Sequence, residues 1–144
     1  MSELVTRKHT FVATAYDHLA VHEKYLFKTD SSPVALNIRA HSNSNFLLSI
    51  NKCDDVTQEG IHIPSFTLND NDEAIAECEV YKNPTYTIAT LWNQTWVTAE
   101  ALEVLNGNLH VGLAPNSTYI ILSKEPVPSA AAYYLLQFNW SEER

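Results

Sequence analysis

The densest group of metal-ligating side chains is an acidic loop in the middle of the chain. It reads Asn69-Asp70-Asn71-Asp72-Glu73, and its carboxylates are the hard oxygen ligands that calcium prefers. The loop lacks the glycine and the more distant glutamate of an EF-hand, so other loops would have to complete the coordination. Solvated loop charges explain the same residues. Calcium at Asp70, Asp72 and Glu73 is the candidate ligand, and we expect no other cofactor.

A second acidic loop contains Asp54, Asp55 and Glu59. Because consecutive antiparallel strands run in opposite directions, this loop and the loop at residues 68–73 are expected at opposite ends of the fold. The two loops should therefore not share an ion.

Nucleophilic catalysis requires a thiol or hydroxyl beside a base, and no familiar signature for it is present. Cys53 and Cys78 have neither CxxC nor CxxH spacing, and no GxSxG or cysteine-protease context surrounds them or any serine. His18 and His22 have the four-residue spacing of a metal pair on a helix, but no candidate exists for the remaining ligands. With only three glycines, a phosphate-cradling loop is not expected. The sequence predicts a protein that is not an enzyme and that carries two buried free thiols.

Aromatic side chains are the remaining candidates for a binding surface. Trp96, Tyr81 and Tyr133 lie on expected strands, and such rings supply large contact areas at low entropy cost. Packing in the core is the alternative for the tryptophans. Tyr133 and Tyr134 are adjacent, so they must face opposite sides of a strand. We expect Trp96, Tyr81 and Tyr133 to form a surface for a protein or sugar ligand.

The elements that must position these residues are short strands. Apolar and polar residues alternate with a period of two in residues 34–40, 46–50, 74–80, 86–92 and 134–140. The first two runs look like a hairpin around the turn-rich residues 41–45. Residues 98–107 fit either a helix or a strand ending in an Asn-Gly hairpin turn, and we favour the hairpin.

Roughly eight to ten short strands separated by turn signals are typical of a sandwich or barrel. We therefore expect an all-β, antiparallel β-sandwich that forms a single domain over residues 1–144. Its expected core comprises Leu36, Ile38, Phe46, Leu48, Ile88, Trp92, Val111, Tyr119, Ile121, Leu136 and Phe138.

Composition restricts the partners that the chain is expected to bind. The net charge of −8 disfavours nucleic acid and anionic lipid, which both require basic patches. The single basic cluster, Arg7-Lys8-His9, is too short to bind a phosphate backbone by itself. No 18-residue apolar run and no signal-peptide pattern is present, so we expect no membrane span and a cytoplasmic location.

The last third of the chain carries a recognisable series of motifs. A turn at residues 113–115 leads into the strand Tyr119-Ile120-Ile121-Leu122-Ser123, then a loop with Glu125-Pro126, then Tyr134-Leu135-Leu136-Gln137-Phe138. This series resembles the end of the calpain regulatory β-sandwich, domain III, a relative of C2-like calcium- and lipid-binding sandwiches. Residues 45–52 resemble an early strand of that domain. The family's acidic loop precedes that strand, whereas here the acidic run follows it, so no calcium or phospholipid role is carried over.

The resemblance implies a non-catalytic regulatory or scaffolding module that acts through protein contacts. Two alternatives stay open at this point. One is a carbohydrate-binding, lectin-like sandwich, and the other is a structural subunit of an assembly. The sequence leaves the partner and the oligomeric state undetermined.

Overall fold

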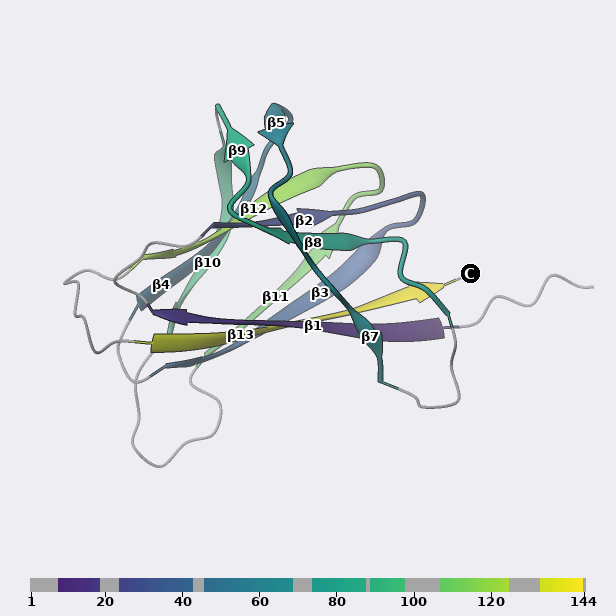
Figure 1. Cartoon of the computed structure of the whole chain (residues 1–144), viewed down its shortest axis with the longest axis horizontal. Coiled ribbons are helices and arrows are strands. Elements are labelled where there is room, and N and C mark those ends of the chain that lie inside the picture. The colour runs from purple at the N-terminus through teal and green to yellow at the C-terminus, as the bar shows by residue number, and fades with distance from the viewer. Residues whose placement is uncertain are drawn as a thin grey trace, which may run out of the picture.

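The computed structural model describes residues 8–18, 24–42, 46–68, 74–87, 89–97, 107–124 and 133–143. These residues contain thirteen strands and no helix (Figure 1). One sheet is built from β1 (Lys8–His18), β3 (Val34–Ser42), β7 (Phe66–Thr67), β11 (Gly107–Leu113) and β13 (Tyr133–Glu143), in the order β11-β3-β13-β1-β7. We call it the five-stranded sheet.

The six-stranded sheet contains β2 (Lys24–Lys28), β4 (Phe46–Lys52), β6 (Ile61–Ile63), β8 (Glu79–Lys82), β10 (Thr90–Val97) and β12 (Thr118–Lys124). Its strand order is β10-β4-β12-β2-β8-β6. A small third sheet pairs β5 (Val56–Gln58) with β9 (Thr85–Tyr86).

The strand pairing is nested. β1 pairs with β13, β2 with β12, β3 with β11 and β4 with β10, all antiparallel. A long hairpin wrapped over two facing sheets in this way is a jelly roll. The predicted all-β antiparallel sandwich is confirmed. The strands outnumber the expected eight to ten because residues 53–89, which we call the insertion, add β5 to β9 between β4 and β10.

The predicted hairpin between residues 34–40 and 46–50 is wrong. β3 pairs with β11 and β13 in the five-stranded sheet, whereas β4 pairs with β10 and β12 in the six-stranded sheet. Alternation shows which face of a strand is buried, but it does not show which strand lies beside it. The possible hairpin turn at residues 98–107 falls almost wholly outside the described residues.

The main core lies between the two sheets. Eight of the expected core residues are buried there, namely Leu36, Ile38, Leu48, Val111, Tyr119, Ile121, Leu136 and Phe138. The side chains of Phe46, Ile88 and Trp92 lie outside the described part of the chain. Tyr25 of β2 and Tyr134 of β13 join the two sheets through a 2.6 Å hydrogen bond between their buried hydroxyls. This polar contact fixes the packing of one sheet on the other at one position.

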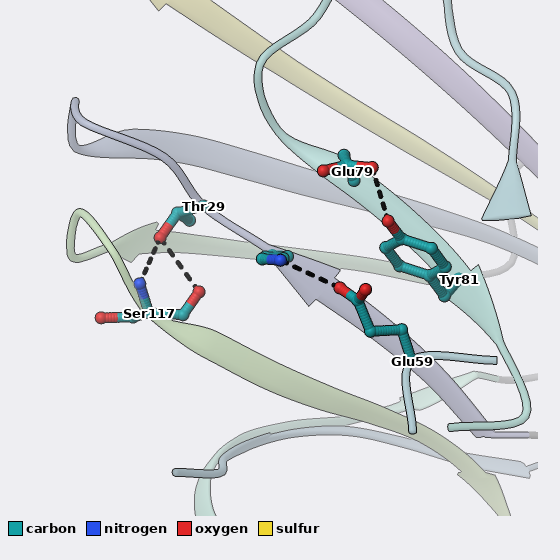
Figure 2. Close-up of polar contacts among 6 residues, drawn as sticks. Thr29, Glu59, Glu79, Tyr81 and Ser117 are labelled. Atoms are coloured by element: carbon teal, nitrogen blue, oxygen red, sulfur yellow. Dashed lines mark hydrogen bonds and ion pairs between the residues drawn. The ribbon is translucent and has the colours of Figure 1, made fainter. Parts of the chain in front are cut away.

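The turn after β2 and the turn before β12 are tied together at one end of the sandwich. The Thr29 hydroxyl donates to the carbonyl of Ala114 at 2.7 Å. It accepts the N–H of Ser117 at 2.9 Å (Figure 2). Thr29 is buried, so these bonds satisfy its hydroxyl away from water.

The insertion covers the outer face of the six-stranded sheet. Leu26 and Ile120 point away from the main core, yet both are fully buried. Val56, Tyr81 and Tyr86 of the insertion pack against them. On the five-stranded sheet, by contrast, the described outward-facing residues of β3 and β13 are all at least partly exposed. The two sheet faces therefore differ in what they present to solvent.

Candidate functional site

The residues predicted to bind calcium cannot be placed. Asp70, Asp72 and Glu73 lie outside the described residues, and calcium binding stays a prediction. Within the ranges that the structure describes, no three His, Cys, Asp or Glu side chains are grouped so as to hold a metal ion. In the other acidic loop, Asp55 accepts a hydrogen bond from the Cys53 thiol at 3.0 Å.

Of the three aromatic side chains predicted to form a binding surface, the structure describes that of Tyr81 alone. Trp96 lies in β10 and Tyr133 begins β13, but their side chains are outside the described part of the chain. Tyr81 lies on β8, where its ring packs on the buried cluster of Leu26 and Ile120. Its hydroxyl donates to the Glu79 carboxylate at 2.5 Å (Figure 2), and desolvation followed by this bond raises the Tyr81 pKa. The ring of Tyr81 is thus packed against the sheet, and its hydroxyl is hydrogen-bonded.

Exposed apolar side chains gather on the insertion instead. Among the described residues, five large apolar side chains are exposed, and four of them belong to residues 61–75, namely Ile61, Phe66, Leu68 and Ile75. Ile75 is the most exposed at 84%. The fifth, Tyr16, lies near the far end of β1. Single exposed apolar residues are ordinary, but several close together in sequence mark a candidate interaction surface.

The path of the chain explains this clustering. β6 pairs with β8 at one edge of the six-stranded sheet, and β7 pairs with β1 at one edge of the five-stranded sheet. Pro64 lies between β6 and β7, has no N–H to donate and holds φ near −65°, so a single continuous strand is disfavoured there. Residues 61–67 are therefore divided between the two sheets. Both short strands thus lie along the same side of the sandwich (Figure 1).

A cleft of about 350 Å³ opens on this side of the sandwich. We call it the side cleft. One wall is the chain that crosses between the sheets, and the other is the segment before β8, with Phe11 of β1 between them. The lining residues are Phe11, His62, Pro64, Ser65, Ala74, Ile75, Ala76, Glu77, Cys78 and Glu79. Among the described residues, this lining combines apolar groups with two carboxylates and contains no lysine or arginine.

A buried carboxylate fixes one wall of the side cleft. Glu142 of β13 is only 2% exposed and accepts three hydrogen bonds from other described residues. The donors are the backbone N–H of Glu77 at 2.9 Å, the backbone N–H of Cys78 at 3.0 Å and the indole Nε1–H of Trp140 at 2.8 Å. Bonds of N–H groups to an ionised oxygen are stronger than neutral ones, and a buried charge requires such partners. Glu142 therefore joins the segment before β8 to the end of β13.

The Cys78 thiol in the cleft wall is not activated as a nucleophile. Burial, followed by the nearby Glu142 charge, raises the pKa of Cys78 to about 12. Because the thiolate is the nucleophile, Cys78 stays a neutral thiol at physiological pH and supplies no thiolate to the cleft. What the cleft offers is apolar contact and carboxylate hydrogen-bond acceptors.

The outer face of the five-stranded sheet is the second surface to consider. Val12, Asn139, Asn37 and His110 lie in one row across four neighbouring strands. The next row is formed by Thr14, Gln137 and Arg39, together with position 108. The Oδ1 atom of Asn37 is buried and has no hydrogen-bond partner within the described residues. This face is rich in amides and poor in charge.

No family model, no curated protein and no solved structure matches this chain. The calpain-like resemblance therefore stays a prediction. The described residues form no helix that is long and apolar enough to cross a lipid bilayer.

The sequence reasoning missed the exposed residues of the insertion because Ile61 alternates with Ile63, and Phe66 with Leu68, as in ordinary half-buried strands. Pro64 in the middle of that run was the available signal that the run is interrupted.

Proposed function

We propose that this chain is a protein-binding module that holds an extended segment of a partner in the side cleft. The observation that carries the proposal is the exposure of Ile75 in the lining of this cleft, together with the exposure of Ile61, Phe66 and Leu68 on the segment that supplies His62, Pro64 and Ser65 to the same lining. Fully burying one such side chain is worth about 1.5–3 kcal/mol, so a partner that covers two of them gains binding free energy at the expense of water contact. The regulatory role implied by the calpain resemblance agrees with this proposal but is not needed for it.

The dimensions and stiffness of the cleft support a peptide ligand. Its volume is near the lower end of the range of about 300–1,000 Å³ typical of small-molecule pockets, which suits one or two side chains. Glu142 holds the wall at residues 77–78, and Pro64 restricts the opposite wall. Walls that are already ordered reduce the entropy lost on binding.

A random-peptide display selection on the immobilised protein tests the proposal. Selected peptides are labelled, and their dissociation constants are measured by fluorescence anisotropy on the wild type, on Ile75→Ser and on Tyr16→Ser. Tyr16→Ser is the matched control, since it removes an exposed apolar side chain that does not line the cleft. We expect Ile75→Ser to weaken binding about tenfold or more and Tyr16→Ser to leave it within about twofold. Equal effects of the two variants, or no selected peptides, would refute the proposal.

A second candidate function is glycan binding on the outer face of the five-stranded sheet. The amide rows of Asn37, Asn139 and Gln137 favour it, because amide side chains can donate to and accept from sugar hydroxyls. A glycan array checks this candidate. A hit that is lost in Asn139→Ala supports it, and an array without hits at high protein concentration removes it.

A further inference from the structure

The outer face of the five-stranded sheet differs in charge from the rest of the chain. Three neighbouring rows of outward side chains cross it. At positions with described side chains these rows comprise Tyr16, Leu135 and His41; Thr14, Gln137 and Arg39; and Val12, Asn139, Asn37 and His110. These positions include one arginine and no aspartate or glutamate, although the chain has 17 acidic residues against nine lysines and arginines. The described centre of this face is therefore positive within an acidic protein.

Arg39 supplies this positive charge. It is exposed on β3, with Asn37 and His41 as its outward neighbours along the strand and Gln137 beside it on β13. A guanidinium stays charged and offers five N–H donors in a planar fork that matches a carboxylate. Among the described residues, the three rows offer Arg39 no carboxylate, so its fork can take the carboxylate of a ligand.

We propose that this face binds an oligosaccharide that carries carboxylates, one of which pairs with Arg39. The amides of Gln137 and Asn139 hydrogen-bond to the sugar hydroxyls, and the ring of Tyr16 contacts the C–H groups of a sugar ring. This inference rests on the second candidate function, glycan binding, and names the class of glycan.

The apolar end and the length of the three rows both suit an oligosaccharide. Tyr16 is 61% exposed and lies beside the half-buried Leu135, so the first row offers the apolar surface on which the C–H face of a sugar can pack. From the first row to the third, each strand advances four residues, which is about 13 Å at about 3.3 Å per residue. A ligand that contacts all three rows is therefore longer than a single sugar ring.

Other anionic ligands fit this face less well. Nucleic acid binds by exchanging counterions for several lysines and arginines, and the three rows offer one arginine in a chain with a net charge of −8. An acidic peptide could pair with Arg39, but it brings few hydroxyl groups to the amides of Gln137 and Asn139. The side cleft is a poor alternative site for such an anion, because two carboxylates line it.

Isothermal titration calorimetry tests the proposal with oligosaccharides of galacturonate, mannuronate and hyaluronan. Each is compared with its methyl ester, in which the carboxylates are neutral. We expect at least one acidic oligosaccharide to bind the wild type, and Arg39→Gln to weaken its binding about tenfold. The methyl ester should bind the wild type and Arg39→Gln within about twofold, because it has no carboxylate to pair with Arg39.

Lys52→Gln is the matched control, since it removes an exposed cation at the end of β4 in the other sheet. It should leave the affinity for the acidic oligosaccharide within about twofold of the wild type. Thermal unfolding of each variant checks that the fold is kept. Equal losses of affinity in Arg39→Gln and Lys52→Gln would overturn the proposal, and so would an oligoglutamate peptide that binds as tightly as the best oligosaccharide.

The outcomes also separate this inference from glycan binding itself. If glycans bind in an Asn139-dependent manner while Arg39→Gln and esterification leave their affinity unchanged, glycan binding stands and its assignment to an acidic class is wrong. If no saccharide binds, neutral or acidic, both fall. Neither result affects the peptide selection that tests the side cleft.

Discussion

Replacing Glu142 by glutamine tests whether the buried carboxylate holds the wall of the side cleft. Its two oxygens accept three N–H groups, two of them from Glu77 and Cys78. Glutamine keeps one accepting oxygen and replaces the other by an NH₂ group, which is a donor. At least one N–H then faces another donor, and the remaining bonds lose the assistance of the charge.

The magnitude follows from these contacts. An unsatisfied buried N–H costs about 1–3 kcal/mol, and a bond to a charged oxygen is about 1 kcal/mol stronger than a neutral one. The glutamine side chain recovers part of this loss because burying it does not desolvate a charge. We therefore expect Glu142→Gln to lower the free energy of unfolding by about 2 kcal/mol, or the Tm by about 6 °C.

The control is Glu143→Gln, the same chemical change at the adjacent and exposed position. Urea unfolding followed by tryptophan fluorescence measures both variants, and Glu143→Gln should stay within about 0.5 kcal/mol of the wild type. Amide hydrogen exchange adds a local readout, since the N–H groups of residues 77 and 78 should exchange faster in Glu142→Gln. Equal stability of the two variants would refute the role assigned to Glu142.

Three further predictions follow from the packing. Gly60 has φ = 98°, and a Cβ there would lie 2.2 Å from the last carbonyl oxygen of β8. Gly60→Ala should therefore lower the free energy of unfolding, measured by urea unfolding, by about 2 kcal/mol or more. Gly112→Ala is the control, because a Cβ at Gly112 would meet nothing within 4 Å. Tyr25→Phe should cost about 1 kcal/mol, and a double-mutant cycle with Tyr134→Phe should show that the two hydroxyls are coupled. Because the pKa of Cys78 is raised, its neutral thiol contributes stability that is present below about pH 9 and is lost as the pH rises toward 12. The wild type should therefore lose more free energy of unfolding over that interval than Cys78→Ala. Parallel curves of unfolding free energy against pH for the two proteins would contradict this.

Much of the core could be predicted from the sequence because burial in strands follows a local period of two. The run from Val34 to Ala40 alternates in sequence, and its inward residues are buried in the structure. The neighbours of each strand could not be predicted in this way, because β3 and β4 are consecutive in the chain but belong to different sheets. Pairing of the first strand with the last depends on contacts between residues far apart in sequence, which a local pattern does not encode.

The candidate site was less predictable than the core. Glu142 continues the inward face of β13 after Phe138 and Trp140, and an acid at the end of an apolar face was a usable signal of a buried, hydrogen-bonded carboxylate. Ile75 offered no such signal. It lies in an alternating run between Ala74 and Ala76, and only the three-dimensional path of the insertion places it at the surface of a cleft.

Mapping backbone amide chemical shifts by NMR, while a selected peptide is titrated into the isotope-labelled chain, tests the central claim most directly. If the side cleft is the binding site, the largest shifts should occur at the amides of residues 62, 63, 65, 66 and 74–79, and the amides of Asn37 and Asn139 should stay unchanged. Shifts confined to the outer face of the five-stranded sheet, with the residues of the side cleft unaffected, would contradict the account.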